Sequence, residues 1–561
     1  MSASPRLRGA ELAALAVGAI AIAIAMSFPL VLHLGTDIPQ DLGDPVRTAW
    51  QVAWEGHALA TQPLHLFSSN AFYPLGDSLA FSDSLLGYAP VALIGSGAKA
   101  ALVRYDLLYL FAYALAFAGA YLLARELGVR PLAAAVAGAA FAYAPFRLTM
   151  NGHLHVISSG GIALALFLML RGYRRRSAWL VVAGWLLAAW QVTLGFTLGL
   201  QLAYLLAVLA VLAAIVWLRR GRPRPPTALL VATGLGIVAF AGVAVVQARP
   251  YLAISDHFPT ARRNDGDLAR YSSPPEGLLA APSESRIWGG ATAPIRDGLP
   301  SPNEDTLFPG IVILGLALLG LFGRRYPPWL RIGLGVGAVV TASLALGIGV
   351  FNGRLGYRLL FDYAPGWDAI RTPGRLITLT SLGLALLAAA GADELFELLG
   401  RRRVAAPALG GVLVAAILLE GSGKLDHPTV PTVPRGQLAA RAPQIHLPSD
   451  ASYDRLYQYW STDGYPAIWN GNSTFSIPAR NTLRAQMAGF PDHRSVAALR
   501  RLGVRTVILH TNLKRVGLPP TFGGVLPRHP LRAVRKPVTG LGITRSPAGD
   551  GVVIYGLGPT R

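Results

Sequence analysis

The chain has no cysteine and few charged residues. Because none of its 561 residues is cysteine, disulfide bonds, thiolate catalysis and cysteine-ligated zinc or iron–sulfur sites are excluded. Only 14% of the residues are charged, against about 25% in an average soluble domain, whereas 53% are hydrophobic. The sequence also lacks a P-loop, a dinucleotide-binding fingerprint and a serine-hydrolase elbow. This composition is typical of a polytopic membrane protein.

Lysine is rare, with 4 lysines against 46 arginines, and this skew is typical of a GC-rich bacterial genome. Acidic residues are also few, so the formal net charge is +21. The arginines gather at the ends of hydrophobic segments, where they mark the cytoplasmic side of a membrane. The basic balance therefore does not indicate a nucleic-acid partner.

The hydrophobic runs predict the membrane topology. A helix needs about 20 mostly apolar residues to cross the hydrocarbon core. Eleven segments meet this requirement approximately, and together they predict an all-α membrane domain over residues 1–420. The predicted spans are residues 11–34, 105–124, 132–150, 154–171, 177–195, 198–218, 227–247, 307–323, 331–351, 376–394 and 404–420.

Arginines then assign the sides of the membrane. They fall on alternate short connections, which is the positive-inside pattern. We therefore expect a multi-pass protein of the bacterial inner membrane with a cytoplasmic amino terminus. The arginines concerned are Arg6, Arg8, Arg125, Arg130, Arg171, Arg174–Arg176, Arg219, Arg220, Arg222, Arg224, Arg324, Arg325, Arg331 and Arg401–Arg403.

The segments predicted to face outward carry most of the polar sequence. In the first outer loop, 36–103, the stretches 45–60 and 84–103 are predicted as juxtamembrane helices, the first with interfacial Trp50 and Trp54 and the second interfacial or re-entrant. Further outer loops are 248–306 and 352–375. Residues 421–561 are predicted as a small extracytoplasmic α/β domain, with strands at 505–510 and 551–557 and a helix at 495–503.

The first outer loop is acidic within a basic chain. It contains six carboxylates and a single arginine, Arg47. Carboxylates at a membrane surface suit proton abstraction from an acceptor hydroxyl that attacks an anomeric carbon. The six are Asp37, Asp41, Asp44, Glu55, Asp77 and Asp83.

Five segments carry a resemblance to a known family. They are LGDPVRTAWQVAWEGHAL, NAFYPLGDSLAFSDSLLGYAP, FRLTMNGHLHVI, IRTPGRLITLTSLGLALLAAAG and DGYPAIWNGNSTFSIP. These segments resemble a bacterial family of integral-membrane glycosyltransferases with the GT-C fold, distant relatives of protein mannosyltransferases and of aminoarabinose and oligosaccharyl transferases. The resemblance implies that the sugar donor is linked to polyprenyl phosphate and reaches the site from the membrane lipid around it. It also implies an acceptor in the cell envelope, whether saccharide, lipid or protein, and a first-loop acidic residue as general base.

Among the first-loop aspartates, Asp44 best matches the position of the general base in the family. The alternative is that Asp44 only caps a helix with Pro45 at its first position. Asp41 is the second candidate, and its alternative is a solvated loop carboxylate. Asp37 is predicted to lie at the end of a span. Asp83 is predicted to contact substrate, or only to cap the helix that follows.

A divalent metal is left open, with Mg²⁺ or Mn²⁺ as the ions that carboxylate oxygens suit. Asp44 and Asp83 are the residues that would hold one. The spacing D-x-x-x-D-x-x-D of the first loop is not a metal-binding signature, which favours a metal-free site.

Polar residues at the ends of spans supply the other substrate-binding candidates. Arg147, His153 and His155 end or begin predicted spans on the outer side. Arg371 and Arg375 flank Pro373, and arginine forks match phosphate oxygens. The alternative for all five is anchoring in the lipid headgroup region.

Two other functions compete with glycosyl transfer. A lipid-linked saccharide ligase or polymerase would depend on the outward arginines and histidines and dispense with the first-loop aspartates. A lipid or saccharide transporter would place charges inside its spans, and these spans have almost none.

Overall fold

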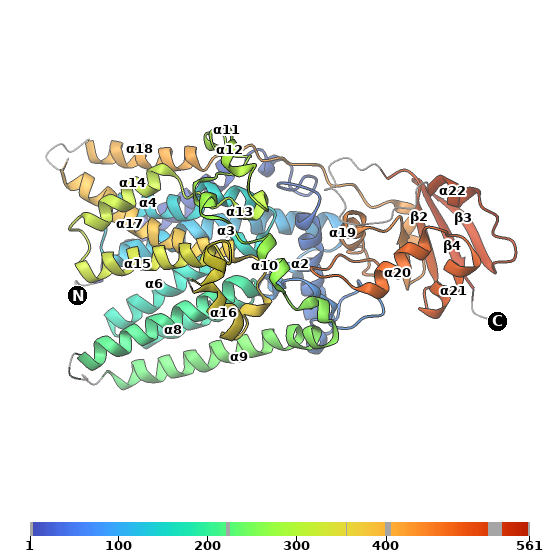
Figure 1. Ribbon diagram of the computed structural model, residues 1–561, viewed down its shortest axis with the longest axis horizontal. Coiled ribbons are helices and arrows are strands. Elements are labelled where there is room, and N and C mark those ends of the chain that lie inside the picture. The colour runs from blue at the N-terminus through green and yellow to red at the C-terminus, as the bar shows by residue number, and fades with distance from the viewer. Residues whose placement is uncertain are drawn as a thin grey trace. The chain divides into compact units, whose positions relative to one another are not determined.

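The fold is given by a computed structural model that describes residues 4–219, 221, 225–354, 356–398, 405–513 and 530–558. Six of the arginines used to assign the sides of the membrane, Arg220, Arg222, Arg224 and Arg401–Arg403, lie outside the described residues. The chain forms two compact units (Figure 1). The helical unit contains residues 1–28, 108–248 and 262–425, and the sheet unit contains residues 29–107, 249–261 and 426–561.

This division differs from the predicted boundary at residue 421, because the first outer loop belongs to the sheet unit. The predicted division into residues 1–420 and 421–561 stays a prediction. Two long helices, α3 (Gly97–Leu127) and α9 (Thr227–His257), contribute residues to both units.

The helical unit consists of apolar helices joined by short connections and a few one-turn helices. Apart from α3 and α9, its helices are α1 (Gly9–Met26), α4 (Pro131–Tyr143), α5 (Leu154–Ile157), α6 (Gly160–Arg175), α7 (Ala178–Val192), α8 (Phe196–Arg219), α10 (Asp265–Arg270), α11 (Trp288–Ala291), α12 (Ala293–Arg296), α13 (Pro302–Asp305), α14 (Ile311–Phe322), α15 (Pro328–Ala345), α16 (Tyr357–Tyr363), α17 (Ile377–Leu398) and α18 (Ala405–Glu420).

Seven helical segments among the described residues are long and apolar enough to cross a membrane, so the chain is a multi-pass membrane protein. The other four predicted spans coincide with shorter helices of 10–17 residues. They are α4, α7, α14 and α18, and they fall short of the roughly 20 residues that span the hydrocarbon core. Of the eleven spans expected from the sequence, seven are therefore supported by helices of sufficient length among the described residues.

The first outer loop contains one of its two predicted helices. Helix α2 (Asp44–Thr61) confirms the helix predicted at 45–60. Its two tryptophans are not interfacial, however, because Trp50 and Trp54 are only 3% and 5% exposed inside the sheet unit.

Residues 84–103 do not form a single juxtamembrane helix. They form a 3₁₀ helix, Leu86–Leu93, with Pro90 inside it, and then the first turns of α3. The break between the two lies at Gly95 and Gly97, whose φ angles of 76° and 80° end regular helix.

The C-terminal part of the sheet unit is a mixed four-stranded sheet. Strands β1 (Gln444–Leu447) and β2 (Thr506–His510) are parallel, and β4 (Val552–Leu557) lies antiparallel between β2 and β3 (Ile543–Gly549). The strands predicted at 505–510 and 551–557 are confirmed as β2 and β4. The helix predicted at 495–503 is confirmed as α21 (His493–Arg501).

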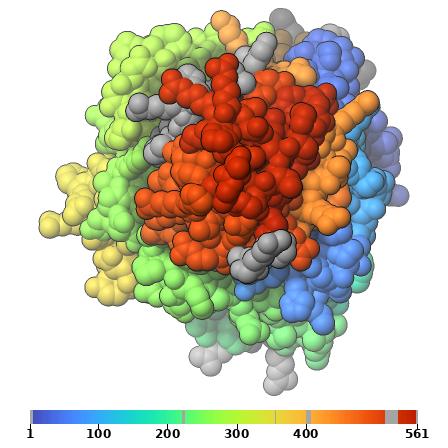
Figure 2. All heavy atoms as spheres, turned by 90° about the vertical axis from the view of Figure 1, so that its right-hand side faces the viewer, coloured from blue at the N-terminus to red at the C-terminus, as the bar shows by residue number. Residues whose placement is uncertain are grey.

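Helices cover both faces of β1 and β2, so these two short strands are fully buried. One face packs on α20 (Pro478–Met487), α21 and α22 (Pro530–Arg535) through an apolar core that includes Val507 and Leu509 (Figure 1). The other face packs on α19 (Ala451–Trp460), where His446 and His510 stack on Tyr457. Figure 2 shows the outer surface of these C-terminal elements in orange and red.

Candidate functional site

Four polar residues form one face of α2. Asp44, Arg47, Gln51 and Glu55 are spaced by three or four positions, so they lie on the same side of the helix. Arg47, Gln51 and Glu55 are 5%, 2% and 0% exposed, which is unusual for side chains of this kind. Buried polar groups are retained where they are paired, and these contact the segment Ser82–Leu85.

Asp44 lies between two arginines. Its Oδ1 is 3.2 Å from Nη2 of Arg455 on α19, and its Oδ2 is 3.7 Å from Nη2 of Arg47. The Asp44 side chain remains 27% exposed, so its carboxylate is accessible to solvent. The helix begins at Asp44 and its N-cap is Gly43, so Asp44 lies in the first turn rather than at the capping position. A carboxylate there also interacts favourably with the helix dipole.

The neighbouring aspartates have local structural roles. Asp41 Oδ1 accepts a hydrogen bond of 2.7 Å from the N–H of Gly43, which fixes the turn before α2. Asp37 Oδ1 accepts one of 2.9 Å from the hydroxyl of Thr429. These contacts make Asp41 a support for the start of the helix.

The segment containing Asp83 is fixed through its backbone. The Gln51 side-chain amide donates to the carbonyl oxygen of Asp83. Tyr251 of α9 accepts a 2.8 Å hydrogen bond from the N–H of Ser84 and donates one of 3.1 Å to the carbonyl of Ser82. The hydroxyl of Ser82 accepts a 2.7 Å hydrogen bond from Arg47 Nη1. Residues of α2 and α9 thus position Asp83, and Asp83 does not cap the 3₁₀ helix, which begins at Leu86.

Glu55 is the most buried carboxyl of this face. Burial raises its pKa to about 8, although the N–H of Leu85 donates a 2.8 Å hydrogen bond to Oε1 and Gln51 contacts the same atom. Its Oε2 is buried and, among the described residues, has no hydrogen-bond partner. At neutral pH Glu55 is therefore a neutral carboxylic acid.

We expect Glu55→Gln to remove a pH dependence of stability. Because the folded state holds a proton that the unfolded state releases above about pH 4.5, stability falls as the pH rises from there to about 8. Between pH 5 and pH 8 the wild-type protein should lose on the order of 3 kcal/mol relative to Glu55→Gln, since one pKa unit corresponds to about 1.4 kcal/mol. Unfolding of both proteins across this range measures the difference, and parallel stability curves would contradict it.

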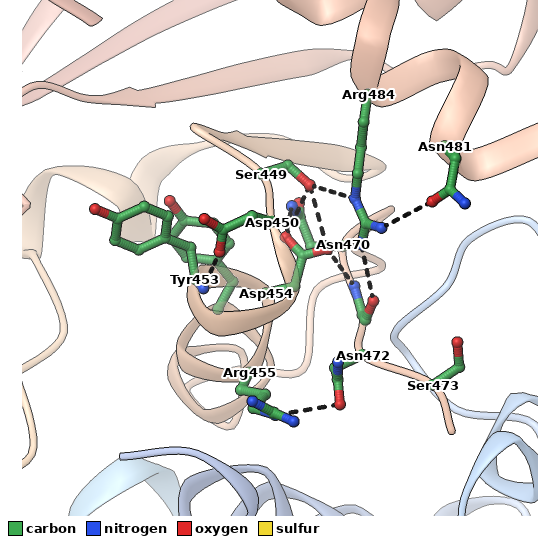
Figure 3. Close-up of polar contacts among 12 residues, drawn as sticks. Ser449, Asp450, Tyr453, Asp454, Arg455, Asn470, Asn472, Ser473, Asn481 and Arg484 are labelled. Atoms are coloured by element: carbon green, nitrogen blue, oxygen red, sulfur yellow. Dashed lines mark hydrogen bonds and ion pairs between the residues drawn. The ribbon is translucent and has the colours of Figure 1, made fainter. Parts of the chain in front are cut away.

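A second network positions the helix that carries Arg455 (Figure 3). Asp454 is fully buried and accepts hydrogen bonds from Ser449 Oγ at 2.9 Å, Asn470 Nδ2 at 2.7 Å and Arg484 Nη2 at 2.6 Å. Arg455 itself donates from Nε to Asn472 Oδ1 at 3.2 Å. The Arg455 guanidinium, which pairs with Asp44, is therefore held by Asn472 and by the helix that the Asp454 hydrogen bonds position.

The helical unit brings three other predicted residues together. Arg375 Nη1 lies 3.1 Å from His155 Nε2, and the rings of His155 and His153 meet edge to face at 5.7 Å. Arg375 Nη2 also donates to Glu304 Oε1 at 3.0 Å. Burial acts to raise the pKa of Glu304, but the charges of Arg375 and His153 hold it below its usual value. Arg375 is therefore already paired with a carboxylate.

Arg147 and Arg371 make separate contacts. Arg147 is 3% exposed, donates a 2.9 Å hydrogen bond to Ser159 Oγ and lies 4.8 Å from the ring centre of Phe141. Arg371 lies 5.2 Å from the ring centre of Tyr271. These aromatic contacts have the geometry of cation–π interactions.

Sequence reasoning missed three residues that complete these clusters, namely Arg455, Tyr251 and Glu304. Each comes from a segment remote in sequence from its partner, and only its charge or hydroxyl group could have drawn attention to it. Among the described residues, no three or more His, Asp or Glu side chains form a group that could hold a metal ion.

Comparison with solved structures shows the fold. The arabinofuranosyltransferase AftD from Mycobacteria matches all of this chain with a TM-score of 0.58 and 14% identity. This chain covers 42% of AftD, so it spans less than half of that protein. The oligosaccharyltransferase of Archaeoglobus fulgidus in its apo form matches 89% of this chain and is covered over 69% of its own length, with a TM-score of 0.45 and 13% identity. The fold is thus GT-C-like.

Comparison by sequence gives a family. No curated protein matches the chain. The model of the family described as "Domain of unknown function (DUF6311)" matches residues 15–419, which is more than half of the 561 residues. The chain therefore belongs to the DUF6311 family.

Proposed function

We propose that this chain is a membrane glycosyltransferase that uses a polyprenyl-phosphate-linked sugar and in which Asp44 is the general base. The observation that carries the proposal is the Asp44 carboxylate, which is 27% exposed and lies between Arg47 and Arg455 at the start of α2. The GT-C-like fold supports the class of enzyme, and the acidic first loop supports the residue.

The proposed step balances as follows. An acceptor hydroxyl oxygen forms a bond to the anomeric carbon, and the bond between that carbon and the phosphate oxygen breaks. The proton of the hydroxyl moves to Asp44, and the polyprenyl phosphate leaves with the bonding electron pair. A guanidinium close to Asp44 would stabilise negative charge on the leaving phosphate, because arginine forks match phosphate oxygens. Both Arg47 and Arg455 have the charge for this role.

The proposal includes the topology predicted from the arginines. In it, residues 36–103 and the C-terminal sheet face the outside of the bacterial inner membrane, where cell-envelope saccharides, lipids or proteins serve as acceptors. The proposal requires no metal ion.

The test is sugar transfer by the purified full-length chain in lipid nanodiscs. Polyprenyl-phosphate donors with a radiolabelled hexose or pentose are incubated with a cell-envelope extract. We expect label to move to the acceptor fraction and free polyprenyl phosphate to appear, with activity unchanged by a chelator. An absence of transfer from every donor would refute the proposal.

A lipid-linked saccharide ligase is the second candidate, and the cluster of Arg375, His155 and Glu304 favours it. A buried guanidinium beside a histidine can bind a leaving diphosphate through its N–H groups and stabilise the negative charge on it. The two functions are separated by paired variants assayed with monophosphate-linked and diphosphate-linked donors.

If the chain is a lipid-linked saccharide ligase, we expect Arg375→Lys to lower turnover of the diphosphate-linked donor on the order of 100-fold, because lysine cannot form the bidentate contacts of arginine. Asp44→Asn would then leave that turnover unchanged. If instead Asp44→Asn abolishes transfer from the monophosphate-linked donor, the ligase reading is excluded.

A further inference from the structure

A cavity of about 130 Å³ lies beside the C-terminal sheet. It is formed by the 3₁₀ turn Arg435–Ala439, strand β1, the end of α19 and the turn that follows. None of its lining residues belongs to the α2 face around Asp44. Its main polar and aromatic lining residues are Gln437, Gln444, His446, Trp460, Ser461 and Asp463.

One side chain in this cavity, that of Gln437, has a buried oxygen without a hydrogen-bond donor among the described residues. Gln437 is only 6% exposed, and its amide oxygen has no hydrogen-bond partner among the described residues. Leaving a buried amide oxygen unpaired costs free energy, so buried polar atoms almost always have a donor. Because Gln437 lines the cavity, a hydroxyl group of a bound molecule could supply that donor.

The neighbouring polar groups are already fixed in orientation. The Gln444 amide donates a 2.7 Å hydrogen bond to the carbonyl of Ala440. Asp463 Oδ1 accepts one of 2.8 Å from the N–H of Ala98. A cavity whose amide and carboxylate groups are held in place is preorganised for hydrogen bonding.

The lining of the cavity favours a neutral ligand. Among the residues that the structure describes, it contains no lysine or arginine. Burial, together with the neighbouring His510, lowers the pKa of His446 well below its usual value, so His446 is neutral. The remaining charged group is the carboxylate of Asp463. The ligand should therefore be a neutral molecule that carries several hydroxyl groups.

The apolar part of the lining suits the face of a sugar ring. Trp460 donates its indole N–H to the carbonyl of Pro431 at 2.8 Å, which fixes the ring. Leu438, which is 57% exposed, and Pro466 add apolar surface to the same cavity. The apolar surface of Leu438 and Pro466 beside amide and carboxylate groups matches the apolar and hydroxyl-bearing sides of a pyranose or furanose, whereas Trp460, which is 2% exposed, packs against Tyr457 and His510.

We propose that this cavity, the Gln437 pocket, binds a neutral saccharide without reacting with it. The pocket would hold one sugar unit on the C-terminal domain. This goes beyond the proposed glycosyl transfer and does not depend on it, because binding requires neither a donor nor turnover.

The test is calorimetric binding of neutral sugars to the full-length chain in nanodiscs, without any donor. The probes are glucose, galactose, mannose and arabinose with their β-linked disaccharides, and glucuronic acid is the charged comparison. We expect at least one neutral sugar to bind and glucuronic acid to bind at least about tenfold more weakly, which corresponds to about 1.4 kcal/mol.

Gln437→Leu is the decisive variant, since it removes an amide whose oxygen has no partner among the described residues, and it should leave the unfolding temperature unchanged or higher. We expect it to weaken binding at least about tenfold. Gln486→Leu on α20, outside the pocket, is the matched control and should bind as the wild type does. Binding of none of the neutral sugars, equal binding by Gln437→Leu, or stronger binding of glucuronic acid would each overturn the proposal.

Discussion

Replacing Asp44 by asparagine should lower sugar transfer by roughly 10²- to 10⁴-fold, the usual range for loss of a general base. Asparagine keeps the size of the side chain and its place in the first turn of α2, but it cannot take the proton from the acceptor hydroxyl. We expect the loss in kcat, while the KM of the donor changes less, because proton transfer occurs in the transition state. Initial rates at several donor concentrations measure both.

Matched variants separate this effect from a general disturbance of the acidic loop. Asp77 is an exposed aspartate of the same loop with a φ angle of 48°, a conformation that asparagine also accepts. Asp77→Asn should therefore retain full activity, and Asp41→Asn should reduce it only by weakening the turn at Gly43. Full turnover by Asp44→Asn would remove Asp44 from the mechanism.

Asp454→Ala should destabilise the sheet unit by about 3–5 kcal/mol, because it leaves the Arg484 guanidinium with no carboxylate in a largely buried place. It also removes the acceptor shared by Ser449 and Asn470 (Figure 3). Because Arg455 follows Asp454 on α19, the change should also disturb the guanidinium beside Asp44. Unfolding of the wild type and the variant in the same detergent gives the difference.

The control comes from the edge of the same network. Arg484 Nη1 donates to Asn481 at 3.3 Å on the exposed side, so Asn481→Ala should cost well under about 1 kcal/mol. Adding Arg484→Met to Asp454→Ala should recover much of the loss, since no unpaired charge then remains. A stability of Asp454→Ala within about 1 kcal/mol of the wild type would show that the ion pair contributes little.

Hydropathy and alternation predicted the parts of the fold that depend on local sequence. β2 and β4 follow from short apolar runs at 505–510 and 551–557, and α2 follows from the helical spacing of Trp50 and Trp54. Hydropathy also found a helix at each predicted span. It overestimated the lengths of α4, α7 and α14, because an apolar run continues past the residue where the helix ends. In α4, for example, the helix stops at Tyr143 before Pro145.

The candidate site was less predictable, because its contacts join remote segments. Asp44 could be singled out from its neighbourhood, but nothing near it in sequence indicates Arg455 as its partner. The burial of Trp50 and Trp54 is similar, since an amphipathic helix with tryptophans looks the same on a lipid surface and inside a protein. Glu304, which pairs with Arg375, lies in a polar connection without a motif.

The sheet unit is built from three separate stretches of the chain, residues 29–107, 249–261 and 426–561. During synthesis the first stretch leaves the ribosome long before the last, and at about 5–20 residues per second the interval is on the order of tens of seconds. During this interval Asp44 does not yet have Arg455 as its partner. The segment around Asp83, which Gln51 contacts, does not yet have its hydrogen bond from Tyr251. A chain cut before residue 426 would lack Arg455, so the Asp44 carboxylate would lose one of its two guanidinium partners.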